Sequence, residues 1–239
     1  MKLIDTALDF IFPPTCGICN KIGEGYICEK CYKEIEKYLY NNKIYYRNIN
    51  KKISKTKTFD TKLETDIFYL LQYKDIIREK MIQYKFNDKS YLYKMFCKIL
   101  VKNKKACEFL KSYDIIIPVP MSKEKKSIRG YNQTELIAKE IAKYFDIQVD
   151  TKNLIKEKHT PMQSSLGKNE RIKNVQNVYK VLYPEKIKGK SILILDDIYT
   201  TGATVNECMK VLQRAGTKNI GTIIIAKDWV SELIDFWCC

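Results

Sequence analysis

Two adjacent carboxylates lie between an apolar run and a hydroxyl-rich stretch of the chain. Asp196 and Asp197 follow the apolar run 192–195, which predicts a short strand buried on both faces. The hydroxyl-rich residues 200–204 come next, and apolar residues then recur at helical spacing. A helix N-terminus offers unpaired N–H groups and a positive dipole end, and Gly202 lets a phosphate approach the backbone closely. The stretch therefore predicts an anion site where a strand meets a helix.

The carboxylates and the threonine hydroxyls are suited to binding different parts of one ligand. Threonine hydroxyls donate to a phosphate monoester, whereas an acidic pair repels phosphate and suits two neighbouring hydroxyls, or a magnesium ion bridging to them. A 5-phosphorylated sugar with free 2- and 3-hydroxyls fits both. The alternative is a strand and an ordinary helix capped by Thr200 or Thr201, which leaves the double carboxylate unexplained. The candidate ligand residues are Asp196, Asp197, Thr200, Thr201, Gly202, Ala203 and Thr204.

Four of the nine cysteines form two C-x-x-C pairs near the N-terminus. Cys16 and Cys19 precede Cys28 and Cys31 by a loop that contains two glycines. This spacing predicts a structural zinc ion bound by four thiolates, with no open coordination position for catalysis. An iron–sulfur cluster uses the same ligands and is the alternative. A thioredoxin-like redox role is less favoured, because neither pair opens a helix in a βαβ pattern.

The length and the patterning predict one ordinary domain with a small appendage. We divide the 239 residues into a helix and finger at 1–40, a basic linker at 41–65 and a main domain at 66–239. Strands at 67–73, 115–120, 192–195 and 221–226 alternate with helical segments, which predicts an α/β fold with a mainly parallel sheet. We read 121–130 as a basic loop. No apolar run approaches the roughly 20 residues of a membrane span, and the N-terminus lacks a signal-peptide pattern, so we expect a cytoplasmic protein.

The chain is strongly basic, which favours a polyanionic partner. Its 43 Lys and Arg residues against 28 Asp and Glu residues give a net charge of +15. Residues 41–62 and 74–105 concentrate this charge among aromatic residues, an arrangement that suits single-stranded DNA. For the first segment, a solvated linker between the finger and the main domain is favoured over a DNA contact. The tyrosines that we expect to stack on unpaired bases are Tyr73, Tyr84, Tyr91 and Tyr93.

Residues 192–204 resemble the phosphoribosyl-pyrophosphate (PRPP) motif of type I phosphoribosyltransferases. With the four-cysteine finger and the sequence Arg129-Gly130-Tyr131-Asn132-Gln133, the whole chain resembles the ComF family, which is associated with DNA uptake in competent bacteria. The resemblance implies a phosphoribosyltransferase-type sheet, PRPP bound with magnesium, and a diphosphate held near Arg129 and Gly130. It also implies a hood over the site that carries Thr160, Gln163 and Arg171. Residues 83–88 resemble a further family stretch, although a helix end and turn explain them at least as well.

Two functions follow from this resemblance. The first is a PRPP-binding protein that handles single-stranded DNA during uptake, with proteins of the uptake machinery as possible partners. The second is an active phosphoribosyltransferase that moves ribose 5-phosphate from PRPP to a nitrogen acceptor. No segment offers an obvious pocket for an acceptor base, so the sequence alone does not separate them.

Overall fold

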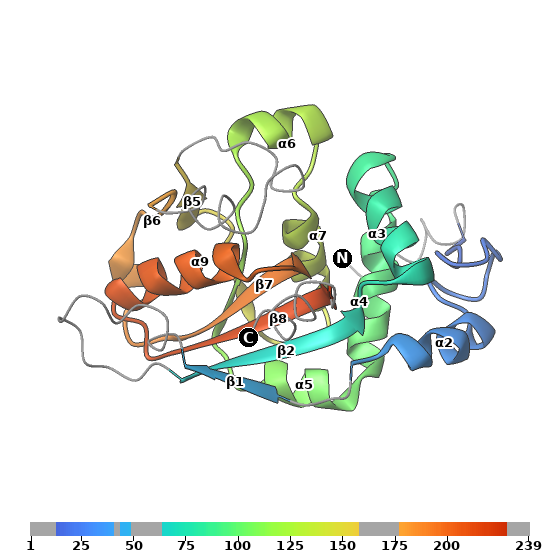
Figure 1. Cartoon of the computed structure of the whole chain (residues 1–239), viewed down its shortest axis with the longest axis horizontal. Helices are drawn as coiled ribbons and strands as arrows, with labels where there is room; N and C mark the ends of the chain where they lie inside the picture. Colours follow the sequence, from blue (N-terminus) through green and yellow to red (C-terminus); the bar gives the residue numbers. More distant parts are fainter. Residues whose placement is uncertain (1–12, 41–43, 49–63, 158–176, 229–239) are drawn as a thin grey trace, which may run out of the picture.

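A computed structural model describes residues 13–40, 44–48, 64–157 and 177–228. Within these ranges six strands form one sheet in the order β1-β2-β8-β7-β3-β4, and β5 and β6 form a separate antiparallel pair (Figure 1). The strands are β1 (Ile44–Asn48), β2 (Glu64–Gln72), β3 (Ile115–Pro118), β4 (Gln148–Val149), β5 (Leu154–Lys156), β6 (Tyr179–Val181), β7 (Ser191–Tyr199) and β8 (Asn219–Lys227). The helices are α2 (Glu29–Ile35), α3 (Asp75–Phe86), α4 (Leu92–Lys102), α5 (Lys104–Leu110), α6 (Lys123–Arg129), α7 (Gln133–Ile141) and α9 (Ala203–Arg214), with 3₁₀ turns η1 (Glu36–Tyr38) and η4 (Pro184–Lys186).

The expected α/β fold with a mainly parallel sheet is confirmed. Strands β2, β8, β7, β3 and β4 pair in parallel, and β1 adds an antiparallel edge strand. β1 lies inside the segment that we expected to be a linker, so residues 44–48 extend the sheet. The carboxyl ends of parallel strands meet at one edge, which is where open α/β sheets bind ligands.

Alternating side chains of β7 bury both faces of the sheet. Leu193 and Leu195 belong to an apolar cluster with residues of α3, α4, α5 and α7. Ile192 and Ile194 belong to a second cluster with residues of α9. This two-sided burial explains why the strand is a continuous apolar run. It also fixes the end of β7 between two layers of helices.

Two further elements differ from the sequence-based expectations. β7 continues to Tyr199, so the acidic pair lies within the strand and not after it, because the neighbouring β8 extends the ladder as far as Tyr199↔Lys227. The basic segment that we read as a loop contains the short helix α6. Its signals are Ser122, which accepts a hydrogen bond from the backbone N–H of Lys125, and Gly130, which ends the helix with φ +80°.

The cysteine finger packs on the main domain and shares its core. Cys16, Cys28 and Cys31 lie in the same apolar cluster as the buried side chains of β2 and α4. Gly17 approaches α4 so closely that an added Cβ would lie 2.7 Å from the Met95 Sδ atom. Helix α4 therefore holds the finger in place. No helix among the described residues has the length and apolar character needed to cross a membrane.

Candidate phosphoribosyl and metal sites

The turn between β7 and α9 is shaped by a glycine. Gly202 is the residue before α9 and has a left-handed conformation with φ +70°. The alternative in which Thr200 or Thr201 caps the helix is not supported, because Gly202 holds the cap position and no side chain caps the helix. The Thr201 hydroxyl instead accepts a hydrogen bond from the backbone N–H of Ala203 at 3.3 Å. A small hollow opens here, lined by Asp196, Ile198, Tyr199, Thr200, Thr201, Gly202, Ala203, Thr204 and Val205.

Asp196 brings a buried carboxyl group to this hollow. Its side chain is 8% exposed, and one of its oxygens accepts a hydrogen bond from the backbone N–H of Asp197. Burial, followed by the charge of Asp197, raises the pKa of Asp196 to about 7, and the charge of Lys85 opposes the rise. A cation or a set of hydroxyl donors at this position would stabilise the charged form. Asp196 is thus suited to a ligand that supplies either.

Asp197 faces a different partner. Its Oδ2 atom lies 2.8 Å from the Nζ atom of Lys85, and both side chains are largely buried. Lys85 lies in the last turn of α3, so the ion pair joins the end of β7 to a helix more than a hundred residues earlier in the chain. The two neighbouring carboxylates therefore differ: Asp196 lines the hollow, and Asp197 pairs with a lysine.

Lys85 has two further cations near it, and we call Lys85, Lys125 and Arg129 the cation cluster. Burial lowers the pKa of Lys125, and the charges of Arg129 and Lys85 lower it further. Arg129 donates from Nη1 to the Gln133 side chain at 2.7 Å, and its guanidinium lies 5.1 Å from the centre of the Phe86 ring. Gly130 ends α6 directly after Arg129. These contacts bring the predicted residue Arg129 to the same edge of the sheet as Asp197, whose charge also acts on it.

The end of α3 is held by hydrogen bonds to the start of α7. Tyr84 is fully buried and donates from its hydroxyl to the backbone carbonyl of Gln133 at 2.8 Å. Tyr131 in turn donates to the backbone carbonyl of Tyr84. Lys85 was not among the predicted site residues, although its signal was present in the family-like stretch 83–88. The structure shows that this stretch contains the end of α3, and it places Lys85 beside Asp197.

The expectation that four tyrosines stack on DNA bases is wrong for Tyr84. This side chain lies inside the core between Phe96 and Tyr131, with ring centres 5.8 Å and 6.0 Å away. Tyr73 and Tyr93 are partly buried against the same core, and Tyr91 is 44% exposed. At helical spacing, Tyr84 lies on the same buried face of α3 as Ile77 and Met81. Among these four residues, Tyr91 is the one that presents an exposed ring.

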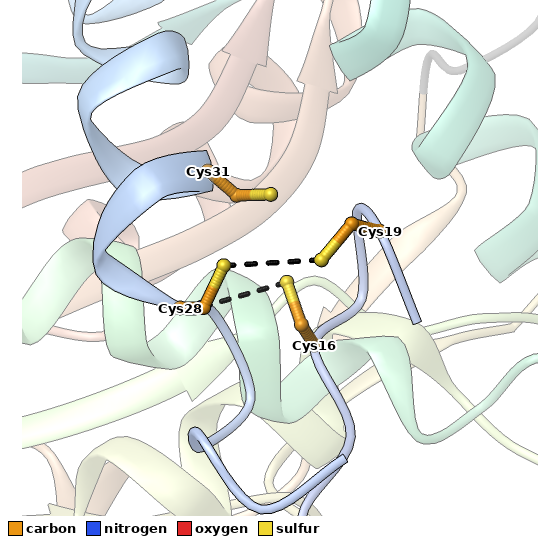
Figure 2. Close-up of side chains that lie close together, drawn as sticks. All are labelled: Cys16, Cys19, Cys28 and Cys31. Carbon is orange, nitrogen blue, oxygen red and sulfur yellow. Dashed lines mark hydrogen bonds between the residues drawn. The ribbon is translucent and has the colours of Figure 1, made fainter. Parts of the chain in front are cut away.

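The four finger cysteines converge on one point, as Figure 2 shows. Their Sγ atoms all lie within 4.8 Å of one another, and those of Cys19 and Cys28 are 3.8 Å apart. A tetrahedral zinc ion with Zn–S bonds of about 2.3 Å needs sulfur–sulfur distances of about 3.8 Å. The predicted ligand set is therefore assembled and compatible with zinc.

The local fold explains this convergence and favours a thiolate at Cys16. A tight turn returns the chain after Cys16, whose backbone carbonyl accepts from the backbone N–H of Asn20, and Cys28 precedes the first turn of α2. Burial raises the pKa of the Cys16 thiol, but hydrogen bonds from the backbone of Cys19 and Cys28 outweigh burial and lower it to about 7. A thiolate at this position is the form that binds metal.

Several predicted residues lie outside the described part of the chain. These are the hood residues Thr160, Gln163 and Arg171, and all of the linker lysines. The hood and the basic linker therefore stay predictions.

Comparison with known proteins agrees with this geometry. Residues 134–233 match the family model of the phosphoribosyl transferase domain. Competence protein F of Haemophilus influenzae is 29% identical over 143 residues, covering 58% of this chain and 62% of that protein. Competence protein ComFC of Streptococcus pneumoniae is 29% identical over 162 residues and 66% of each chain. DNA utilization protein YhgH of Escherichia coli K12 is 30% identical over 103 residues, covering 43% of this chain and 44% of that protein.

The chain thus spans between about two fifths and two thirds of the length of these relatives. Among solved structures, adenine phosphoribosyltransferase of Saccharomyces cerevisiae superposes with a TM-score of 0.40 and 10% identity, over 84% of this chain and 90% of that one. The matches to the competence proteins, the phosphoribosyl transferase domain and the assembled four-cysteine cluster point to one family. The sequence matches and the cysteine cluster together support the predicted similarity of this chain to the ComF family of phosphoribosyltransferase-like proteins.

Proposed function

We propose that this protein binds PRPP together with magnesium and acts in DNA uptake by handling single-stranded DNA on the cytoplasmic side. One observation carries the ligand assignment. A buried carboxyl, a hydroxyl-rich turn opened by a left-handed glycine, and a cluster of cations all lie at the carboxyl edge of one parallel sheet. These are the groups that a ligand with a phosphate, two free hydroxyls and a diphosphate requires.

Each part of PRPP has a chemically matched partner in this proposal. The 5-phosphate binds at residues 200–204, where α9 begins and its first backbone N–H groups are unpaired within the helix. The ribose hydroxyls bind near Asp196 and Asp197, directly or through magnesium. The diphosphate binds near Arg129, whose planar fork suits phosphate oxygens. The hood residues 160–171 then cover the bound ligand and exclude water.

The role in DNA uptake rests on the relatives and on charge. Two of the relatives are named competence proteins and a third a DNA utilization protein. The net charge of +15 supplies a long-range attraction for a polyanion. Exposed cations that can bind phosphates lie on or beside α3 and α5: Lys74, Arg78, Lys104 and Lys105.

Fluorescence anisotropy with labelled single strands at several salt concentrations tests the DNA assignment. Replacing Lys74, Arg78, Lys104 and Lys105 by glutamine should reduce the slope of log K against log salt by about 0.7 for each phosphate that is no longer neutralised. The charge-matched control replaces Lys186, Lys188, Lys190 and Lys218, exposed cations that lie near the amino ends of β7 and β8. Equal slopes for both variants, or equal affinity for single and double strands, would contradict the assignment.

Phosphoribosyl transfer is the second candidate function. The cation cluster favours it, because three positive groups beside the expected diphosphate stabilise the charge that develops as pyrophosphate departs. The reaction breaks the bond between the ribose and the diphosphate and forms a bond to a nitrogen acceptor. Measuring pyrophosphate release from PRPP across candidate nitrogen acceptors separates the two functions. Release that depends on one acceptor would establish the enzyme, and PRPP binding without release would favour the binding protein.

A further inference from the structure

The ion pair between Lys85 and Asp197 joins two groups that the proposed ligand would separate. Asp197 is expected near the ribose hydroxyls, and Lys85 is 2.8 Å from it. The side chains of Lys85 and Asp197 are 18% and 15% exposed. At this degree of burial an ion pair is only weakly screened by solvent. In the protein without ligand, Asp197 is therefore already occupied.

The surroundings of Lys85 carry more positive charge than Asp197 balances. Burial disfavours the protonated form of Lys125 in α6, and the nearby charges of Arg129 and Lys85 disfavour it further. Arg129 is oriented by two fixed contacts, the hydrogen bond to Gln133 and the stacking on Phe86. Neighbouring cations favour a multivalent anion, because such a ligand relieves the repulsion that Arg129 and Lys85 exert on Lys125. A diphosphate is an anion of this kind.

The backbone under Lys85 is fixed, so any adjustment falls to its side chain. Tyr84 anchors the last turn of α3 through its hydrogen bond to Gln133 and the one it receives from Tyr131. A lysine side chain has four methylene groups, and its ammonium can move from a carboxylate to a neighbouring phosphate without displacement of the helix. In Figure 1 α3 and α6 stand next to each other, and the stacking of Arg129 on Phe86 confirms that their ends meet.

We propose that Lys85 is a diphosphate-binding residue that occupies Asp197 until the ligand arrives. On binding, the Lys85 ammonium exchanges the Asp197 carboxylate for the diphosphate, and Asp197 becomes free to accept the ribose hydroxyls or a magnesium ion. Binding of one part of the ligand thereby prepares the site for the other part. This inference rests on the proposed function, because it takes PRPP as the ligand.

The exchange predicts effects of opposite sign on two ligand fragments. Lys85→Gln should weaken the binding of inorganic pyrophosphate, titrated without magnesium, by about tenfold or more, because glutamine supplies no positive charge to the phosphate oxygens. The same variant should bind ribose 5-phosphate as well as the wild type or several-fold better, because Asp197 no longer has a partner to release. Asp197→Asn should do the reverse, with tighter pyrophosphate binding and weaker ribose 5-phosphate binding.

Isothermal titration calorimetry on the full chain measures all of these affinities. Lys89→Gln is the matched control, since Lys89 carries the same charge just beyond α3 but donates to the side chain of Gln83. It should alter both affinities less than twofold. Lys85→Arg keeps the positive charge and should retain pyrophosphate binding. If Lys85→Gln fails to fold, this second variant still tests whether a positive charge at position 85 binds pyrophosphate.

Four outcomes bear on the inference. Equal reductions in the affinity for both fragments in Lys85→Gln, or unchanged pyrophosphate binding, would overturn it. Opposite effects in Lys85→Gln and Asp197→Asn would support it. A wild type that binds pyrophosphate through Lys85 but does not bind PRPP would overturn the proposed function and leave Lys85 as an anion-binding residue, so the two failures are distinguishable.

Discussion

The Oδ1 atom of Asp196 accepts a hydrogen bond from the backbone N–H of Asp197 at 2.9 Å. This contact stabilises the Asp196 carboxylate, but burial and the adjacent Asp197 charge outweigh it and raise the pKa of Asp196 to about 7. An unfavourable charge at a binding site is a common property of functional groups, because the ligand supplies the missing stabilisation. Asp196 is therefore a group whose removal affects stability and binding in opposite directions.

Asp196→Asn should stabilise the protein at alkaline pH. The pKa of Asp196 in the native state lies above its unfolded value of about 3.9, so the native state binds more protons than the unfolded state between these two values. The native state therefore loses stability as the pH rises from about 4 through 7. At pH 8 the variant should melt a few degrees higher, as about 1 kcal/mol shifts the midpoint by roughly 2–4 °C in a chain of this size. The gain should disappear near pH 4. Thermal melts at both pH values measure it, with exposed Asp146→Asn as the control, and an equal shift at both would contradict this prediction.

One zinc ion per chain should be present and should stabilise the main domain as well as the finger. Cys31→Ser removes one ligand of the buried cluster, and in four-thiolate sites the free energy of metal binding contributes to folding. Because the finger cysteines share a core with β2 and α4, the whole chain should melt earlier. Elemental analysis and thermal melts test this, with Cys107→Ser as a control outside the cluster. Iron in place of zinc would favour the iron–sulfur cluster, and protein without any bound metal would refute the metal site.

Gly17→Ala should loosen the finger from α4. The added Cβ would lie 2.7 Å from Met95 Sδ and 2.9 Å from Leu92 Cδ2, so the buried side chains of α4 have to shift. Overpacking of this kind costs about 1–3 kcal/mol. The free energy of unfolding from denaturant titration measures the cost, which should shrink when Leu92→Ala provides space in a double mutant. Strict additivity of the two changes would show that the predicted clash does not exist.

The amino-acid pattern predicts much of the fold because the parallel strands are long apolar runs between turn residues. The four cysteines are also predictable, since C-x-x-C spacing alone brings each pair of sulfurs to one point. Lys85 is harder to predict, because apart from the family-like stretch 83–88 no local pattern distinguishes it from the many other lysines. Its role depends on α3 packing beside β7, a contact between distant parts of the chain. Tyr84 shows the same limit: its basic neighbours favour a DNA contact, but the core face of α3 buries it.

The turn between β7 and α9 is the proposed binding site for the phosphate of a phosphoribosyl ligand. Gly202 has φ +70° there, a conformation that disfavours a β-branched side chain and leaves the backbone accessible. Calorimetric titration of wild type and Gly202→Val with PRPP and magnesium, with inorganic pyrophosphate as the reference ligand, tests this assignment. We predict one PRPP per wild-type chain, at least tenfold weaker PRPP binding by the variant, and similar pyrophosphate binding by both. Absence of PRPP binding to the wild type, or equal PRPP affinity in the folded variant, would contradict it.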